Sequence, residues 1–317
     1  MHSLVKNKKE DLSPVNRHLR SEKGMALVIT LMILVIITAV VVEFSYGVYT
    51  TTASLYNWRD SQRLSLVAGS GISLAVKTIS DTQSLYSYTY PDRMEIPVEN
   101  VLKGFKGSLL IRFEDENSRF NVNSLVAPNG ITNNRAYDSF RRLLKNLDLD
   151  ENIAERVADW IDRDNLPRMR DSESGSKNAY MESVDELLLI KGIDGKTYEK
   201  LSPYVTVYGL GRTDSDLVNI NTASIPVIMS LDERITKELA GRIIDYRSLS
   251  PFETASDIVR VAGFEGPLGT SLMGRIVVKA SNFRITSVAG ENGIKRIIES
   301  VFEIRDNSNI ARYWREF

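Results

Sequence analysis

The sequence contains no cysteine, and both of its histidines, His2 and His18, lie close to its N-terminus. Without cysteine the chain has no thiol nucleophile, no disulfide, no iron–sulfur cluster and no cysteine-ligated zinc site. Without histidine in the rest of the chain, a histidine general base is excluded there as well. Phosphate-binding loops, nucleophile elbows and metal–histidine motifs are also missing. We therefore expect a protein that is not an enzyme.

The sequence also lacks an excess of charge of one sign, because it contains 40 basic and 41 acidic residues. A net charge of −1 argues against a protein that coats nucleic acid, since such proteins usually carry a basic surplus. The chain has 317 residues, of which 43% are hydrophobic. This length and composition allow two or three folded domains and exclude a disordered chain.

A long apolar run near the N-terminus is the first prominent feature. Residues 1–24 carry six basic and three acidic side chains. Residues 25–42 follow without a charge and are nearly all aliphatic, which makes the run long enough to span a bilayer. By the positive-inside rule, this arrangement predicts a single-pass membrane protein with a cytoplasmic N-terminus and a body on the other side of the membrane.

Three interpretations of this region are open. A secretory signal peptide usually has a shorter apolar core, and no small-x-small cleavage site precedes Glu43. A simple membrane anchor is the second interpretation. The third is that Lys23, Gly24 and Met25 resemble the end of a type IV prepilin leader, which a dedicated peptidase cuts after the glycine before the new N-terminus is methylated. This resemblance implies that Gly24 and Met25 form a processing site.

Beyond the apolar run, the sequence predicts one long helix followed by strands. No proline occurs between Glu43 and Ile79, and apolar residues recur there at helical spacing. Strands are expected at residues 86–90, 108–113, 283–288 and 294–304. Asn292-Gly293 is a strong hairpin signal between the last two. Because a terminal hairpin needs a sheet to pair with, we expect the early and late strands to form one sheet.

Two mainly helical blocks separate those strands. Helices are expected at residues 135–146, 151–161, 183–190, 195–201, 235–246 and 254–260. The fold class is therefore α+β, with a long N-terminal helix packed on a small antiparallel sheet that a large helical insertion interrupts. The expected parts are a leader at 1–24, a membrane span at 25–42, helix and first strands at 43–118, helical blocks at 119–208 and 209–280, and final strands at 281–317.

Each helical block begins with an Asn-x-Asn unit, Asn121 to Asn123 in the first and Asn219 to Asn221 in the second. Asparagine at such positions accepts hydrogen bonds from free backbone N–H groups, so we expect each unit to cap the start of its block. The second unit also resembles the start of a helix-hairpin-helix in competence-type DNA receptors. That resemblance makes a membrane-anchored DNA receptor the main alternative function.

The hairpin-like turns of the two blocks argue against that alternative. A helix-hairpin-helix holds a DNA phosphate with backbone N–H groups and therefore needs turns without negative charge. Here the turns contain Asp194, Asp232 with Glu233, and Glu265. We therefore interpret the blocks as interaction modules with helix-hairpin-helix or SAM-like units, and we do not expect nucleic acid as a partner.

An acidic stretch in the first block is the candidate metal site. Its candidate ligands are Asp159, Asp162, Asp164, Asp171 and Glu173. Asp159 and Asp162 share a helix face, and clustered carboxylates suit Ca²⁺, which takes roughly six to eight oxygen ligands. The alternative is a solvated acidic loop in which Arg156, Arg163 or Arg168 pairs with the acids. Calcium is the one cofactor that the residues suggest.

Five stretches, taken in order, resemble general secretion pathway protein K, the family of minor pseudopilin K in type II secretion systems. They are KGMALVITLMIL, DENSRFNVNSL, VADWIDRDNLPR, SVDELLLIKGID and VNINTAS. The resemblance implies a pilin-like sheet with an inserted helical domain, an inner-membrane precursor cut by prepilin peptidase, and a periplasmic body. It also implies a place at the pseudopilus tip together with minor pseudopilins I and J, and the major pseudopilin as a further partner. A minor pilin of a type IV pilus-like assembly is the related alternative.

The family is one whose pseudopilus drives folded proteins through an outer-membrane secretin, so secretin and secreted substrate are further expected partners. Ile29 is the fifth residue after the expected cleavage point, where most pilins carry a glutamate that neutralises the N-terminus of the subunit above. A subunit at the tip has no subunit above it and needs no such carboxylate in the membrane.

The resemblance also implies calcium in the acidic loop, which favours Asp162 and Asp164 as ligands. One residue departs from the family pattern. Lys177 stands where a carboxylate is often found, so Asp171 or Glu173 would have to supply the missing carboxylate ligand.

Overall fold

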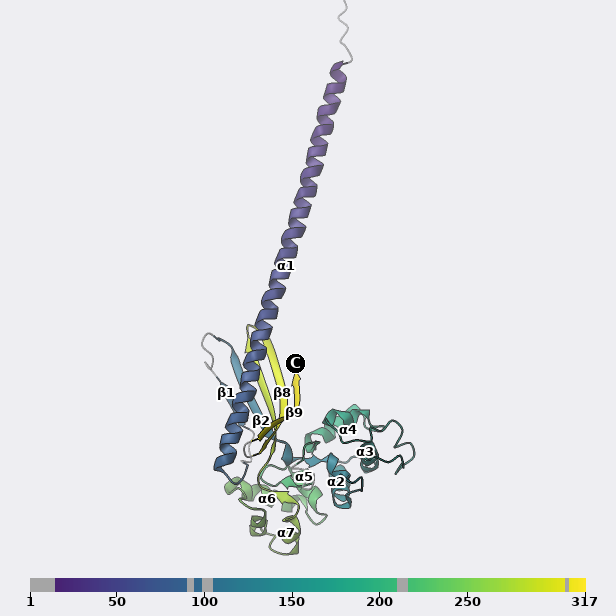
Figure 1. The fold of residues 1–317 in the computed structure, drawn as a ribbon, viewed down its shortest axis with the longest axis vertical. Helices are drawn as coiled ribbons and strands as arrows, with labels where there is room; N and C mark the ends of the chain where they lie inside the picture. Colours follow the sequence, from purple (N-terminus) through teal and green to yellow (C-terminus); the bar gives the residue numbers. More distant parts are fainter. Residues whose placement is uncertain (1–14, 90–93, 99–104, 210–215, 306–307) are drawn as a thin grey trace, which may run out of the picture. The chain divides into compact units, whose positions relative to one another are not determined.

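The computed structural model describes residues 15–89, 94–98, 105–209, 216–305 and 308–317, with the backbone alone for 15–23 and 94–98. Residues 1–14 of the expected leader lie outside the described residues. The chain forms two compact units, residues 1–62 and residues 63–317. Figure 1 labels their helices and strands.

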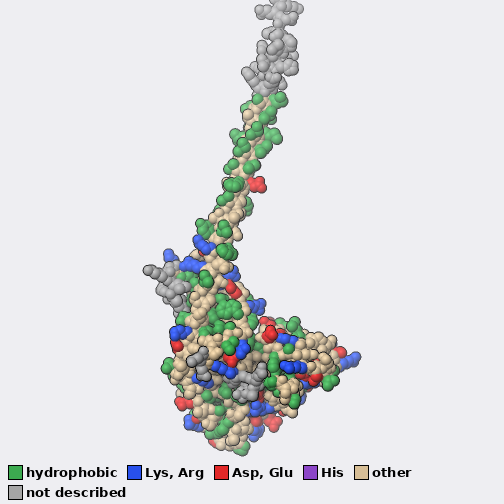
Figure 2. All heavy atoms as spheres, viewed as in Figure 1, with side chains coloured by type: hydrophobic (Ala, Val, Ile, Leu, Met, Phe, Trp, Pro, Cys, Tyr) green, Lys and Arg blue, Asp and Glu red, His purple; other side chains and the backbone are tan. Residues whose placement is uncertain are grey.

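Helix α1 (Val15–Leu85) contains 71 residues and contributes to both units. Its most apolar window has a mean hydropathy of 3.1, and none of that window is buried in the protein. Hydrophobic side chains cover this exposed length of the helix in Figure 2. A helix that is apolar all round and unburied by protein has the length and composition of a membrane span. The prediction of a single N-terminal anchoring helix is therefore supported.

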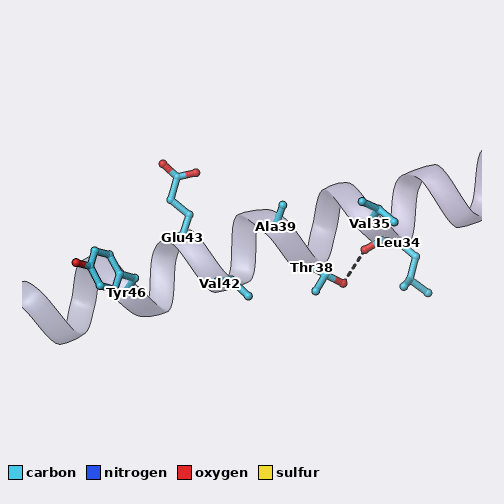
Figure 3. A pocket seen from close by; sticks show the side chains of 7 residues that line it. All are labelled: Leu34, Val35, Thr38, Ala39, Val42, Glu43 and Tyr46. Carbon is cyan, nitrogen blue, oxygen red and sulfur yellow. Dashed lines mark hydrogen bonds between the residues drawn. The ribbon is translucent and has the colours of Figure 1, made fainter.

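Polar groups within the apolar part of α1 are satisfied by the helix itself. Figure 3 shows one face of this part, where the Thr38 hydroxyl donates a 2.7 Å hydrogen bond to the carbonyl oxygen of Leu34. The Thr30 hydroxyl likewise donates to the Leu27 carbonyl at 2.9 Å. In lipid an unsatisfied hydroxyl would cost several kcal/mol, so these bonds make the threonines compatible with a bilayer.

The second unit contains a five-stranded antiparallel sheet with the strand order β1-β2-β7-β8-β9. Its strands are β1 (Met94–Val98), β2 (Ser108–Asp115), β7 (Asn282–Glu291), β8 (Ile294–Arg305) and β9 (Ser308–Glu316). Asn292 and Gly293, both with positive φ (53° and 82°), form the predicted turn between β7 and β8. Because β2 pairs with β7, the early and late strands belong to one sheet, as expected.

The strand expected at residues 86–90 is wrong for its described part. Helix α1 continues past the predicted end at Ile79 to Leu85, and residues 86–89 are irregular. The helix continues because no proline or glycine interrupts residues 80–85. The two edge strands, β1 and β9, were not predicted.

The C-terminal part of α1 packs on one face of the sheet through apolar residues at helical spacing. The buried contacts from the helix are Leu64, Val67, Ala68, Ile72, Ala75 and Ile79, and those from the sheet include Leu109, Ile111, Phe283, Ile285 and Ile298. Each large aliphatic side chain buried here contributes about 1.5–3 kcal/mol. A Cβ at Gly71 would collide with Ser287 Oγ, so the helix reaches the sheet only because residue 71 has no side chain.

Two helical blocks, which share one hydrophobic core, lie between β2 and β7 in the chain. The first contains β3 (Phe120–Asn121), η2 (Val122–Leu125), α2 (Asn134–Asn146), α3 (Ile153–Ile161), η3 (Val184–Leu189), α4 (Gly195–Leu201) and β4 (Val205–Thr206). The second contains β5 (Val218–Asn219), α5 (Ile225–Leu231), α6 (Lys237–Leu249), η5 (Ala255–Arg260), α7 (Pro267–Leu272) and β6 (Ile276–Val277). In each block the first and last strands pair in parallel. The α+β class and the helical insertion are thus confirmed.

The predicted helices match α2, α3, α4 and α6 with ends that differ by a few residues. The helices expected at 183–190 and 254–260 are the short 3₁₀ helices η3 and η5. Helices α5 and α7 were missed. Both are at most seven residues long and carry proline in the first turn, so they offer too little sequence for a periodic pattern.

The two Asn-x-Asn units do cap their blocks. The Asn121 side chain accepts a hydrogen bond from the Asn123 N–H at 3.1 Å, and Asn219 does the same for Asn221, also at 3.1 Å. The second asparagine of each unit has a further role that was not predicted. Asn123 donates to the carbonyls of Met181 and Val207 at 2.9 and 3.0 Å and accepts from the Met181 N–H at 2.8 Å.

Asn221 repeats this arrangement in the second block. It donates to the carbonyls of Phe252 and Val278 at 2.9 and 3.2 Å and accepts from the Phe252 N–H at 2.9 Å. One side-chain amide therefore joins the beginning, the middle and the end of each block, and that of Asn221 is fully buried. The loose sequence repeat corresponds to a repeated structural device.

Candidate functional site

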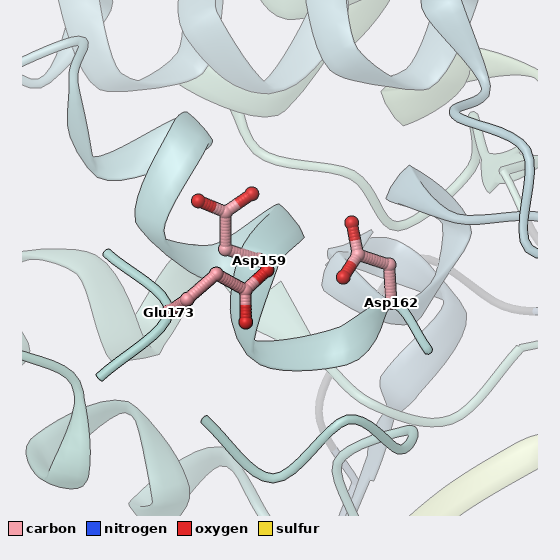
Figure 4. A group of neighbouring side chains, drawn as sticks. All are labelled: Asp159, Asp162 and Glu173. Carbon is pink, nitrogen blue, oxygen red and sulfur yellow. The ribbon is translucent and has the colours of Figure 1, made fainter. Parts of the chain in front are cut away.

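The acidic candidates lie at the C-terminal end of α3 and in the loop that follows it. Asp159 is in the last turn of α3, Asp162 is the residue that ends the helix, and Glu173 returns from the loop (Figure 4). Each of the three residues offers a carboxylate oxygen to a group whose atoms lie within 4.8 Å of one another. Asp159 and Asp162 are fully buried. The structure thus brings together three of the five predicted ligands.

Arg168 supplies the positive charge that faces this group. Its Nη1 donates to both Asp159 Oδ1 and Asp162 Oδ2, and its backbone N–H donates to Asp159 Oδ2 at 2.9 Å. Its Nη2 donates to the hydroxyl of Thr132 at 3.0 Å. The hydroxyl of Ser172 also donates to Asp159 Oδ2. Of the three arginines that the sequence offered as partners, the structure selects Arg168.

Other oxygens of the group have no hydrogen-bond donor among the residues that the structure describes. They are Asp162 Oδ1 and both carboxylate oxygens of Glu173, and all three atoms are buried. Burial raises the pKa of Asp162 above its usual range, against the opposing effect of Arg168. Burial also raises the pKa of Glu173, and the neighbouring Asp159 and Asp162 raise it further. Buried carboxylate oxygens without donors are a cost to the fold unless a cation contacts them.

Asp164 and Asp171 do not join the group. Asp164 is exposed and accepts a hydrogen bond from the Leu166 N–H at 2.8 Å. Asp171 is exposed and lies 3.6 Å from Lys191 Nζ. Lys177, which the resemblance places where a carboxylate is often found, donates to Glu186 at 2.9 Å.

A second polar centre, which the sequence did not reveal, lies where β2 ends. Asp115 is buried and accepts hydrogen bonds from the Asn117 N–H (2.6 Å), Asn219 Nδ2 (2.7 Å) and the Thr222 hydroxyl (2.5 Å). Burial raises its pKa to about 6, although these three donors lower it. Asp115 therefore joins the sheet to the second helical block.

The two residues that follow join the sheet to other parts of the chain. Glu116 is fully buried and accepts from Arg284, Arg119 and the Thr206 hydroxyl, at 2.5, 2.7 and 2.5 Å. Burial alone would raise its pKa, but the two guanidinium groups hold the pKa below its usual value. Asn117 Oδ1 accepts from the N–H groups of Ser281 and Asn282, both at 2.9 Å. Three consecutive side chains thus fix the first block, the second block and the return to the sheet.

The acids in the hairpin-like turns bind the N–H groups of their own turns. Asp232 accepts from the Arg234 N–H at 3.0 Å, Glu265 from the Gly263 N–H at 2.8 Å, and Asp194 from the Thr197 N–H at 2.8 Å. Hydrogen bonding from the Arg234 side chain lowers the pKa of Asp232 to about 2, so this acid stays ionised. In each turn a carboxylate therefore accepts a hydrogen bond from a backbone N–H.

Comparisons with known proteins bear directly on the two helical blocks. Family models described as type II secretion system (T2SS), protein K, match residues 118–210 and residues 218–279. These matches coincide with the first and second blocks. The chain belongs to the type II secretion system protein K family.

Protein K of Pseudomonas aeruginosa is 33% identical to this chain over 172 residues, which is 49% of each chain. Protein K of Aeromonas hydrophila is 29% identical over 236 residues, which covers 64% of this chain and 68% of the relative.

The match thus spans about half the length of the Pseudomonas protein K and about two thirds of the Aeromonas one. A solved structure resembles this chain over most of its length. It is the crystal structure of the GspK-GspI-GspJ complex from the enterotoxigenic Escherichia coli type 2 secretion system, with a TM-score of 0.63. The likeness covers 82% of this chain and 98% of the matched chain at 19% identity, so it supports the shared fold.

Proposed function

We propose that this member of the protein K family is a minor pseudopilin that acts at the tip of a type II secretion pseudopilus during protein export across the outer membrane. The observation that carries the proposal is one exposed apolar helix followed by an antiparallel sheet that the two protein K blocks interrupt. The similar crystal structure is that of a GspK-GspI-GspJ complex. Minor pseudopilins I and J are therefore the proposed partners, together with the major pseudopilin.

The N-terminal helix is proposed to be processed between Gly24 and Met25 by prepilin peptidase and then methylated. A side chain at Gly24 would meet no atom within 4 Å, so the described fold has no steric need for glycine there. Recognition by a peptidase that cuts after glycine would explain why glycine occurs at this position. In this proposal the anchor lies in the inner membrane, with a cytoplasmic N-terminus and a periplasmic body.

The tip position is supported by the residue at the fifth place after the cleavage point. This residue is Ile29, which is exposed on the apolar part of α1 and brings no carboxylate into the membrane. A subunit with another subunit above it would gain from a carboxylate there, because an unpaired amino terminus in lipid is costly. Ile29 fits a subunit that starts the filament.

The helical blocks are proposed to bind protein and not DNA. Their hairpin turns already hold the carboxylates of Asp194, Asp232 and Glu265 on the N–H groups that a phosphate would use. A gel-shift titration of duplex DNA against the protein tests this, with an Asp232→Gly variant that frees the Arg234 N–H. We expect no shift for either chain. Tight, salt-dependent binding by the unaltered protein would favour the DNA-receptor alternative.

The acidic group on α3 is proposed to hold a calcium ion. The donor set fits, because three carboxylates converge and three of their oxygens are buried without a donor among the described residues. Asp159, Asp162 and Glu173 are the proposed residues of the site. A bound ion would supply the positive charge that these oxygens need and would tie the loop to α3.

Co-purification tests the proposed function. The body without residues 1–45 contains both hydrophobic cores of the second unit, so it is the part to combine with the bodies of minor pseudopilins I and J. We expect a complex of all three in size-exclusion chromatography. A body that melts cooperatively but captures neither partner would contradict the proposal. Capture of minor pilins from a type IV pilus instead would favour the pilus-like alternative.

A further inference from the structure

We propose that Arg168 is a resident cation of the acidic group, and that a divalent ion binds beside it, on Asp162 Oδ1 and the Glu173 carboxylate. The inference rests on the calcium site proposed above and divides that site into two halves. One half is filled by the chain's own guanidinium group. The other half is left for metal.

Asp159 belongs to the filled half. Its Oδ1 accepts from Arg168 Nη1, and its Oδ2 accepts from the Arg168 N–H at 2.9 Å and from the Ser172 hydroxyl. Both oxygens of this buried carboxylate therefore have donors that belong to the protein. Three of the roughly four lone-pair sites of this carboxylate already accept hydrogen bonds, so Asp159 has the least room for a metal ion among the three acids.

Asp162 and Glu173 form the open half. Asp162 gives Oδ2 to Arg168 and keeps Oδ1 free, while neither oxygen of Glu173 has a donor among the described residues. When all three acids are ionised, one guanidinium against three carboxylates leaves two negative charges uncompensated. A divalent ion carries the charge that would balance them, and a fully buried acid with a free oxygen gives it a ligand.

Arg168 is held in place by contacts outside the group, so an arriving ion does not have to replace it. Its Nη2 donates to the Thr132 hydroxyl at 3.0 Å, and Thr132 forms a bridge with Val126 ahead of α2. The guanidinium therefore links the acidic loop to a different part of the first block. Two consequences follow: Arg168 keeps the loop folded in the absence of metal, and its charge weakens metal binding.

The test compares the full chain in detergent with Arg168→Gln, using exposed Arg163→Gln as the matched control on the same loop. Melting is followed with chelator and with calcium chloride, and calcium affinity is measured by calorimetry. In chelator, Arg168→Gln should melt lower by roughly 10 °C, because two buried acids lose their cation. Calcium should restore most of that loss and bind Arg168→Gln about tenfold or more tightly than the unaltered chain.

A second variant covers the case in which Arg168→Gln does not fold. Asp159→Asn combined with Arg168→Gln removes the internal pair together and leaves Asp162 and Glu173. It should bind calcium, and adding Glu173→Gln should abolish the binding. If the unaltered chain binds calcium and the double variant does not, the division into halves is wrong.

Equal melting of Arg168→Gln and Arg163→Gln in chelator would overturn the role of Arg168. Absence of calcium binding in every variant would overturn the shared site and the proposed calcium site, while the melting comparison still decides the role of Arg168.

Discussion

Asp115 gives the sharpest quantitative prediction, because one buried carboxylate joins the sheet to the second helical block. Burial raises its pKa from the ordinary value of 3.8 to about 6. Between those two values the folded chain binds more protons than the unfolded chain. The stabilising contribution of this group is therefore fully present below about pH 4 and is lost as the pH rises through about 6.

The size of the effect follows from the shift. A rise of about two pKa units corresponds to about 3 kcal/mol. Asp115→Asn cannot ionise, so this pH-dependent loss disappears in the variant. The variant also places an amide N–H₂ near the Asn219 side-chain donor, a pH-independent cost of about 1–3 kcal/mol. The difference in unfolding free energy between the two chains should thus change by about 2 kcal/mol from pH 4 to pH 7, in favour of the variant as the pH rises.

Urea unfolding of the body at several pH values measures this difference. Asp138→Asn, at an exposed position on α2, is the control and should run parallel to the unaltered chain at all pH values. Parallel curves for Asp115→Asn would refute the reasoning, because they would mean that burial of Asp115 does not disfavour its charge. A difference that changes in the opposite direction would mean that the three donors outweigh burial.

Three further predictions concern single side chains. Gly24→Ala should leave the melting temperature unchanged but block removal of the leader, as seen by intact mass, whereas the unaltered mature protein should start at Met25. Gly71→Val should lower the unfolding free energy by several kcal/mol, because its side chain would collide with Ser287 between helix and sheet. Asn221→Ala should cost about 3 kcal/mol or more in urea unfolding, because it removes the side-chain partner of both the N–H and the carbonyl group of Phe252 in a buried site.

These predictions have matched controls in the same chain. Gly47→Ala is the control for Gly24, since an added Cβ there also meets nothing within 4 Å, and it should be processed normally. Gly69→Val is the control for Gly71→Val, because the nearest neighbour of a Cβ at residue 69 would be Ile298 at 4.0 Å, an ordinary contact. Asn146→Ala, which loses a single 3.4 Å hydrogen bond, should cost much less than Asn221→Ala. Equal costs within either stability pair would contradict the assigned contacts.

Local signals made part of the fold predictable. Asn292-Gly293 specifies its turn by its own backbone preference, and the α2 and α6 patterns are long enough to show a helical period. Strand β9 could not be found this way. All but one of its residues are exposed, so no alternation of buried and exposed side chains marks it in the sequence. Strand β1 has only five residues and contains Pro97, which argues against a strand except at an edge.

The candidate site shows the same limit. Asp159 and Asp162 could be paired from helical spacing alone, but the loop that returns Glu173 has no periodic pattern, and it also decides which arginine reaches the acids. The second polar centre, at the end of β2, was missed for a different reason. Asp115, Glu116 and Asn117 contact residues that lie 90 to 168 positions later in the chain, and no local sequence pattern reveals contacts over such separations. An acidic run directly after an apolar strand was the one available signal.

The register of the sheet has a consequence for assembly. Asp115, the last residue of β2, pairs with Phe283 near the start of β7, so the chain leaves the sheet and returns to it at neighbouring positions. The whole helical insertion therefore occupies the place of a hairpin loop at one end of the sheet. The insertion adds no strand to the five-stranded sheet, and β2 and β7 pair as neighbouring antiparallel strands. In the proposed position at the pseudopilus tip, the subunit would carry the two helical blocks without changing the strand order of its sheet.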